Sequence, residues 1–159
     1  PESQLDRFMI KLSMGYPDKE QEINILKARA CVNPLDMVGK VADENSILSL
    51  QTAAENVYIH DAIYDYIVRL ARATREHEYI ALGVSPRGTL ALAAMAKAYA
   101  LCEDRDYCIP TDVKNVFVDV VSHRLVLNSK ARINKITEIQ TAVEILNETA
   151  VPRLKKGKD

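Results

Sequence analysis

Two arginines are the residues of this sequence whose type and position best suit chemistry. The stretch GVSPRGTLALAAMAKAYAL, residues 83–101, reads as a helix with Ser85 as its N-cap and Pro86 at its first position. Arg87 follows at once. A helix N-terminus carries partial positive charge, so a cation there is unfavourable unless an anion lies nearby. The sequence therefore predicts an anionic partner for Arg87.

The helical wheel sharpens this requirement. With an advance of about 100° per residue, Arg87 groups with three alanines on the side expected to pack. These are Ala91, Ala94 and Ala98, whereas the side expected to face solvent holds Thr89, Ala93, Lys97 and Asp104. A buried carboxylate of the same chain and a bound phosphate would both suit Arg87, since arginine and free helix N–H groups bind phosphate oxygens well. The residues by themselves favour the carboxylate.

Arg7, in the segment QLDRF, raises a weaker version of the same question. We expect a helix to end and a strand to begin near this residue. The C-terminus of a helix favours a cation, so capping of that helix is a sufficient reason for Arg7 on the residues alone.

Several kinds of chemistry are excluded because their motifs are missing. Gly39–Lys40 has Pro34 where a phosphate-binding P-loop needs its first glycine, and Val41 where it needs Ser or Thr. The histidines are scattered, with no His/Glu pair at metal-ligand spacing, so we predict surface or capping roles and no metal site. They are His60, His77 and His123. No Gly-x-Ser-x-Gly nucleophile motif occurs.

Composition limits the partners of the chain. Its 159 residues carry a formal net charge of −1, which argues against binding nucleic acid by general basicity. We find no apolar run long enough to span a membrane and no signal peptide, and we expect a cytoplasmic protein. The three cysteines fit neither a disulfide framework nor a zinc site. We expect buried, reduced thiols at Cys31, Cys102 and Cys108.

Hydrophobic periodicity predicts a mostly α-helical chain with one strand. Alternation over residues 8–14 predicts a strand with one buried face. Helices are expected from Pro17, over about 46–56, 61–76 and 86–103, from Thr111, and over about 134–149. Asp61 and Thr111 are expected to cap the helices that they begin. The expected core residues of four of these helices are Ile23, Leu26 and Ala30; Ile63, Ile67, Leu70 and Thr74; Val113, Val116, Phe117, Val120 and Val121; and Ile136, Ile139, Val143 and Leu146.

Several segments, taken in order, resemble the C-terminal part of MoxR-type AAA+ ATPases. PESQLDRFMIKLSMGYPD is similar to a family signature, PEAQLDRF followed by GYPD. NPLDMVGKV, ILSLQTAAENVYIHDAIYDYIVRLARATREH, LGVSPRGTLAL and RDYCIPTDVKNVFVDVVSHRL also match in order and spacing. The resemblance extends to about residue 150.

The resemblance implies a fold and a domain arrangement. The fold would be mostly α, an AAA+ helical lid bundle preceded by a short helix end and one β-strand from the ATPase core. Residues 1–16 would be the C-terminal end of the large nucleotide-binding subdomain. Residues 17–127 would form the helical lid subdomain, and residues 128–159 a C-terminal helix and polar tail.

The resemblance also implies roles for both arginines. Arg7 corresponds to the arginine finger, which one subunit presents in trans to the γ-phosphate bound by its neighbour. Arg87 corresponds to the sensor-2 arginine, which the lid brings to the nucleotide phosphates in cis or in trans. Both roles suit the planar donor fork of arginine, and we expect Arg87 at an exposed edge of the lid. Gly88 stands where the family often has alanine, and its lack of a Cβ would let a phosphate approach closely.

The implied function is ATP binding and hydrolysis, with Mg²⁺, at the subunit interfaces of a homo-oligomeric ring, expected to be a hexamer. Such proteins act in chaperone-like remodelling or maturation of partners, often proteins with von Willebrand factor A domains. The Walker A, Walker B and sensor-1 segments are missing from this sequence, so we expect the fragment to be inactive alone, although the intact protein would be an ATPase. The alternative is a non-enzymatic helical protein-interaction module with no nucleotide role for Arg87.

Overall fold

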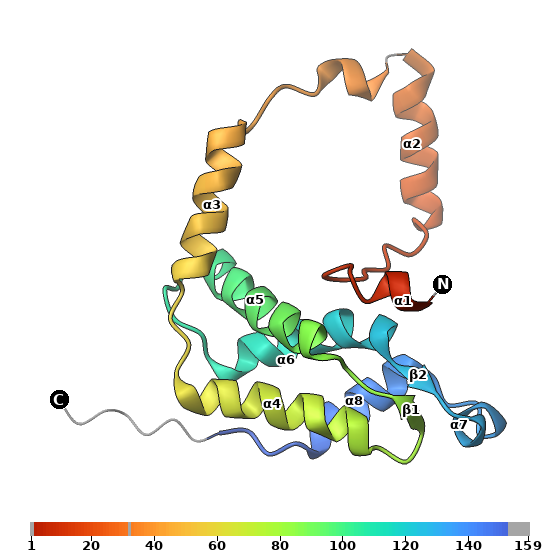
Figure 1. The fold of residues 1–159 in the computed structure, drawn as a ribbon. Helices are drawn as coiled ribbons and strands as arrows, with labels where there is room; N and C mark the ends of the chain where they lie inside the picture. The colour runs from red at the N-terminus through yellow and green to blue at the C-terminus, as the bar shows by residue number, and fades with distance from the viewer. Residues whose placement is uncertain (1, 32, 153–159) are drawn as a thin grey trace. The chain divides into compact units, whose positions relative to one another are not determined.

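The computed structural model describes residues 2–31 and 33–152 and divides into two units (Figure 1). One unit contains the residues up to Lys11 together with those from Gln51 onward, and the other runs from Leu12 to Leu50. The first unit carries both arginines, because the N-terminal segment that holds Arg7 belongs to it rather than to the second unit.

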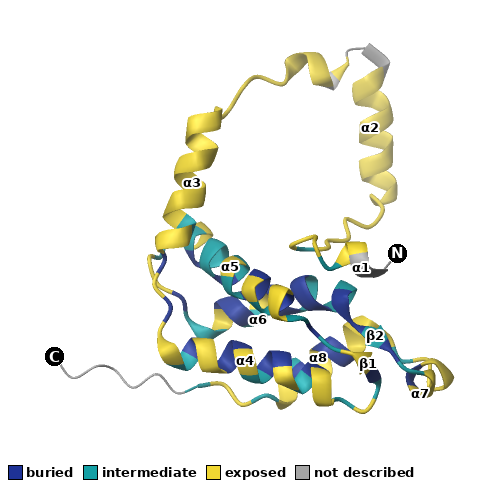
Figure 2. Cartoon of the chain, in the orientation of Figure 1, coloured by how far each residue is buried: buried dark blue, intermediate teal, exposed yellow. Residues whose placement is uncertain are grey.

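The unit Leu12–Leu50 is made of helices with no buried face. It contains α2 (Lys19–Cys31), a 3₁₀ turn η1 (Pro34–Met37) and the beginning of α3 (Glu44–Asn56). Every residue of this unit whose burial is described is exposed (Figure 2), so the expected inward positions of Ile23 and Leu26 are wrong. The side chain of Ala30, expected to lie beside them, is outside the described part of the structure. Local caps stabilise these helix starts, as where the Asp43 carboxylate accepts a 2.8 Å hydrogen bond from the Ser46 N–H.

The strand expected over residues 8–14 does not form. A β-strand is stable only when its N–H and C=O groups pair with a neighbouring strand, and the described residues offer none beside this segment. Phe8 and Leu12, two of the apolar residues in this alternation, are 57% and 66% exposed. The expected helix end before it does form, as the short α1 (Glu2–Leu5).

The larger unit packs helices around one apolar core. Its main helices are α4 (Asp61–Glu76), α5 (Pro86–Cys102), α6 (Pro110–Val121) and α8 (Glu138–Glu148), with η2 (Ser122–Arg124) and α7 (Ser129–Ile133) between the last two. α5 lies against α4 and α6, and α8 lies against α4 and α6. The strands β1 (Ile80–Leu82) and β2 (Val126–Leu127) pair antiparallel, with Ile80 opposite Leu127.

The apolar stripes of two helices are confirmed, and that of a third is confirmed in part, since Ile136 and Leu146 are partly buried against the core. All four expected core residues of α4 and all five of α6 are buried. In α8, however, Ile139 and Val143 are 58% and 41% exposed. That helix instead approaches its neighbours through Thr141, Ala142 and Ile145, whose mostly small side chains allow close packing. It also begins later than expected, because Thr137 caps it by accepting from the Gln140 N–H.

Two expected N-caps are displaced. His60, rather than Asp61, caps α4, since its Nδ1 accepts a 3.1 Å hydrogen bond from the Ala62 N–H. α6 begins at Pro110, a residue suited to the first helical position because it has no N–H to satisfy. Thr111 is therefore inside the helix and exposed.

The thiols differ in environment. Cys108 is buried as expected, and this burial raises the pKa of its thiol to about 11, with the nearby Asp112 carboxylate acting in the same direction. Cys102 is exposed, contrary to expectation, because it lies at the C-terminal end of α5, and both thiols are free. The side chain of Cys31 lies outside the described part of the structure.

Candidate functional site

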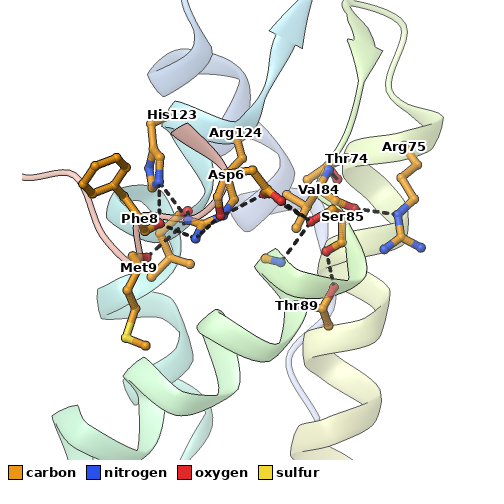
Figure 3. Close-up of polar contacts among 12 residues, drawn as sticks. Asp6, Phe8, Met9, Thr74, Arg75, Val84, Ser85, Thr89, His123 and Arg124 are labelled. Carbon is orange, nitrogen blue, oxygen red and sulfur yellow. Dashed lines mark hydrogen bonds and ion pairs between the residues drawn. The ribbon is translucent and has the colours of Figure 1, made fainter. Parts of the chain in front are cut away.

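The turn before α5 is held tightly against the end of α4. A Cβ on Gly83 would lie 2.7 Å from backbone atoms of Thr74 and Arg75, so only glycine fits there. The hydroxyl of Thr74 accepts a 3.0 Å hydrogen bond from the Val84 N–H, and Arg75 Nε donates to the Val84 carbonyl at 2.9 Å (Figure 3). The backbone that leads into the Ser-Pro-Arg motif is thus held at both the N–H and the carbonyl of Val84.

Ser85 caps α5 and at the same time contacts the N-terminal segment. Its hydroxyl oxygen accepts from the Gly88 N–H at 3.1 Å, and its hydroxyl hydrogen faces the Asp6 carboxylate, whose oxygens lie 3.1 and 3.0 Å away. Pro86, next in the helix, has no N–H. Two of the first three helical positions therefore have no free N–H for a ligand, and an anion at this helix start would depend mainly on the Arg87 side chain.

Arg87 is exposed, as the resemblance predicts. The helical-wheel expectation that it faces the packed side is wrong, because the buried face of α5 is centred elsewhere. That face consists of Gly88, Ala91, Leu92, Ala96 and Ala100. Among the described residues, no carboxylate pairs with the Arg87 guanidinium, so the internal partner that the residues favoured does not appear there.

Arg124, in contrast, is buried and contacts several groups, although its Nε makes no hydrogen bond within the described part of the chain. Its Nε lies 3.3 Å from a carboxylate oxygen of Asp6. One terminal nitrogen, Nη2, donates to the carbonyls of Phe8 at 2.5 Å and of Asp6 at 3.3 Å. The other, Nη1, donates to the carbonyl of Met9 at 3.2 Å and to that of Val120. Figure 3 shows these contacts converging on one guanidinium.

Gly88 provides space for that side chain. A Cβ at this position would lie 2.9 Å from Arg124 Cδ and 2.7 Å from Val84 Cγ1. Gly88 is buried and its N–H is already bonded to Ser85, so the expected close approach of a phosphate to this residue is wrong. The missing Cβ instead lets Arg124 pass directly beside the first turn of α5.

Burial and two charged neighbours act on the guanidinium of Arg124. Burial lowers the pKa of its guanidinium, the Asp6 carboxylate opposes that effect, and the positive charge of Arg87 adds to it. Asp6 is the carboxylate that pairs with Arg124 among the residues that the structure describes. Arg87, in the first turn of α5, is an exposed cation.

Two further residues frame the N-terminal segment. His123 Nε2 lies 3.1 Å from the Phe8 carbonyl, and burial lowers the pKa of this imidazole. Arg7 is exposed and has no hydrogen bond or ion pair within the described part of the chain, although its neighbours Asp6 and Phe8 are both held by Arg124. The structure therefore brings the segment of Arg7 and the helix of Arg87 into one polar network.

Sequence reasoning missed Asp6 and Arg124, and for His123 it predicted only a surface or capping role. One signal was present: the buried stripe of α6 continues through Val120 and Val121, and Arg124 is the next residue on that face. A charged residue at the next position of an apolar stripe needs a buried partner, and this position could have been identified.

Comparison with known proteins shows which proteins this chain resembles. Residues 72–149, which include Arg87 and Arg124, match the AAA lid domain. Over 96% of its length, the chain superposes with a TM-score of 0.88 and 33% identity on a solved structure from Cytophaga hutchinsonii described as a "putative ATPase". The chain contains an AAA lid domain. The expected mostly helical lid fold is thereby confirmed.

Two curated relatives match the lid protein over nearly its whole length. It is 36% identical over 163 residues to "Chaperone MoxR1" of Mycobacterium tuberculosis and 38% identical over 152 residues to the protein YeaC of Bacillus subtilis. These matches cover 97% and 96% of the lid protein but only 43% and 48% of the relatives. The chain thus spans about half the length of the curated relatives it matches.

Proposed function

We propose that this lid senses bound ATP through Arg87, in a ring protein that binds and hydrolyses ATP at its subunit interfaces. The observation that carries the proposal is the exposed Arg87 guanidinium, which has no ion pair among the described residues and lies at the first turn of a rigidly held helix. Within the described part of the chain, a phosphate would meet a donor fork with no ion pair that has to break first.

The surroundings of Arg87 favour an anion further. The N-terminus of α5 carries a partial positive charge beside Arg87, which favours an anion there. The backbone before α5 is fixed by Thr74 and Arg75, so the position of Arg87 follows that of the lid as a whole. Nucleotide binding would therefore bias the lid toward the position in which Arg87 reaches the phosphates.

We assign Arg7 the role of an arginine finger that acts in trans. Its exposure and its lack of a partner among the described residues leave its guanidinium available to a neighbouring subunit. In phosphoryl transfer, an arginine supplied in this way stabilises the charge of the transition state and is worth about 10³–10⁵ in rate in well-studied cases.

The fit to the cofactors differs between ATP and Mg²⁺. Arg87 and Arg7 suit nucleotide phosphates, whereas the described residues contain no group of three or more side chains able to hold a metal ion. We therefore expect the ligands of Mg²⁺ to lie mostly outside the lid protein. No described helix combines the length and apolar character that crossing a membrane needs.

The work done with ATP would be chaperone-like remodelling or maturation of partner proteins by a homo-oligomeric ring, which we expect to be a hexamer. The support for this part is the name "Chaperone MoxR1" of a relative that is 36% identical. Partners with von Willebrand factor A domains are the class that the family resemblance favours.

The test compares Arg87→Ala and Arg87→Lys in the full-length protein, with Arg132→Ala on the exposed surface of α7 as the matched control. Loss of a charge-assisted phosphate contact, worth about 1.5–3 kcal/mol, should weaken ATP affinity or turnover about 10- to 100-fold for Arg87→Ala and leave circular dichroism unchanged. Arg87→Lys should recover only part, because it lacks the planar fork.

The contradicting result is a loss of folding in Arg87→Ala without any nucleotide defect in the molecules that remain folded. That result would favour a structural ion pair and the non-enzymatic interaction module. For Arg7, mixing Arg7→Ala subunits with subunits that cannot bind ATP should restore some turnover at mixed interfaces. Failure of every mixture would exclude a finger that acts in trans.

A further inference from the structure

Arg124 binds one short segment on both sides of Arg7. It donates to the carbonyls of Asp6, Phe8 and Met9, so its hydrogen bonds flank Arg7 within four residues. This segment is not part of a strand or helix and has few other backbone bonds, among them Lys11 N–H to the Asp119 carbonyl at 3.0 Å. Among the described side chains, Arg124 therefore makes the most hydrogen bonds to this segment, with His123 beside it at the Phe8 carbonyl.

The same side chain touches the start of α5. Arg124 lies against Gly88, in a space that a Cβ would fill, and its ion-pair partner Asp6 is also bonded to Ser85. Ser85 in turn accepts from the Gly88 N–H. These contacts form a closed set that joins Arg124 to Asp6, Asp6 to Ser85, Ser85 to Gly88, and Gly88 back to Arg124. Arg87 lies between Ser85 and Gly88 in the sequence.

Stability alone does not explain a guanidinium at this position. Arg124 continues the apolar stripe of α6, where an apolar side chain would pack without the penalty of desolvating a charge. A buried guanidinium, however, has five donors in a fixed planar arrangement. It can hold several carbonyls at defined positions at once, which an apolar side chain cannot do.

We propose that Arg124 is a positioning residue, which fixes the segment Asp6–Met9 against the first turn of α5 and so keeps Arg7 and Arg87 at a constant spacing within one subunit. This rests on the proposed function, in which Arg7 contacts the nucleotide bound by the neighbouring subunit and Arg87 contacts the nucleotide that the lid covers or adjoins. A change of lid position would then move both arginines together, which links two nucleotide contacts of the ring.

The decisive variant is Arg124→Lys in the full-length protein, with Arg132→Lys as the matched control. Lysine keeps the positive charge beside Asp6 but presents its donors from a single nitrogen, so it cannot reach carbonyls on both sides of Arg7 together. Hydrogen–deuterium exchange reports the segment directly, and steady-state ATP turnover reports its consequence. Arg124→Lys should speed exchange in the peptide that contains Asp6–Lys11 by about tenfold or more, while the core of α4 and α6 keeps its protection.

Turnover separates positioning from simple loss of stability. A finger displaced by about 1 Å should lower kcat about 10- to 100-fold with KM for ATP nearly unchanged. The effect should also disappear in an Arg7→Ala background, because a positioning residue acts only through the residue that it positions. If Arg124→Lys does not fold, Asp6→Asn weakens the same network and should give the same pattern at smaller amplitude.

Each outcome is informative. Faster exchange with a lower kcat that depends on Arg7 supports the proposal. Unchanged exchange in Asp6–Lys11, or an equal kcat loss with and without Arg7, overturns it. If Arg7→Ala lowers turnover and Arg124→Lys does not, the positioning proposal fails and the proposed function stands. If Arg7→Ala and Arg87→Ala both leave turnover unchanged, the proposed function fails and the positioning proposal fails with it.

Discussion

The substitution Gly88→Ala tests whether Arg124 is packed across the start of α5. A Cβ at this position would lie 2.9 Å from Arg124 Cδ, 3.1 Å from its Nε and 2.7 Å from Val84 Cγ1. Relaxed carbon–carbon contacts are about 3.5–4.0 Å, so both side chains must move. Neither can move freely, because Arg124 is held by its hydrogen bonds, and Val84 is buried with its own N–H and carbonyl bonded to Thr74 and Arg75.

The magnitude follows from two opposing effects. Replacing glycine by alanine in a helix interior stabilises by up to about 1 kcal/mol, and by less in the first turn where Gly88 lies. Overpacking of a close-packed site usually costs about 1–3 kcal/mol. We therefore expect Gly88→Ala to lower the free energy of unfolding by about 1–2 kcal/mol, although helix propensity alone predicts an increase.

Two other glycines calibrate the experiment. A Cβ on Gly39 would meet nothing within 4 Å, so Gly39→Ala should be close to neutral. A Cβ on Gly83 would meet the backbone of α4 at 2.7 Å, so Gly83→Ala should be more damaging than Gly88→Ala. Urea unfolding followed by circular dichroism gives all three free energies. If Gly88→Ala proves as stable as wild type or more stable, the packing of Arg124 across this residue is refuted.

Three further predictions concern the body of the lid. Asp112→Asn should lower the free energy of unfolding by about 2 kcal/mol or more in urea unfolding, because the buried carboxylate makes 2.5 and 2.8 Å hydrogen bonds to Arg105 that a neutral amide replaces only in part. Burial lowers the pKa of His123, so as pH falls the unfolded chain takes up a proton at a higher pH than the folded chain does. The free energy of unfolding should therefore decrease as pH falls below about 6.5. Unfolding of His123→Asn, measured across about pH 5–7.5, should show a smaller decrease. At pH 8 a thiol reagent should modify Cys102 in the native chain and Cys108 only after unfolding, as peptide mapping by mass spectrometry will show.

Much of the helical architecture could be predicted from the sequence, because it depends on local patterns. The stripes of α4 and α6 are spaced at three and four residues, and Ser85–Pro86 is a strong helix start. The prediction of a strand over residues 8–14 was wrong because a strand depends on more than its local pattern. Alternation identifies a segment that could be extended with two unlike faces, but a strand also needs a partner, and no local pattern states whether one is there.

In the site, too, local features could be predicted from the sequence and contacts between distant residues could not. Alanine packs on either side of a helix, so grouping Arg87 with three alanines did not identify the buried face; Leu92 and Ala96 do. The contacts of Arg124 join residues more than a hundred positions apart in the chain, and no spacing rule connects Asp6 with Arg124. What the sequence did reveal was an arginine without an evident partner at the start of α5.

The central claim, that Arg87 contacts a nucleotide phosphate, is tested most directly by a structure of the full-length ring with a non-hydrolysable ATP analogue. The account predicts an Arg87 guanidinium nitrogen within about 3 Å of a phosphate oxygen, the length of a charge-assisted hydrogen bond. In the same structure Arg124 should remain bonded to Asp6 and Phe8. An Arg87 side chain paired with a protein carboxylate, away from every bound nucleotide, would contradict the claim.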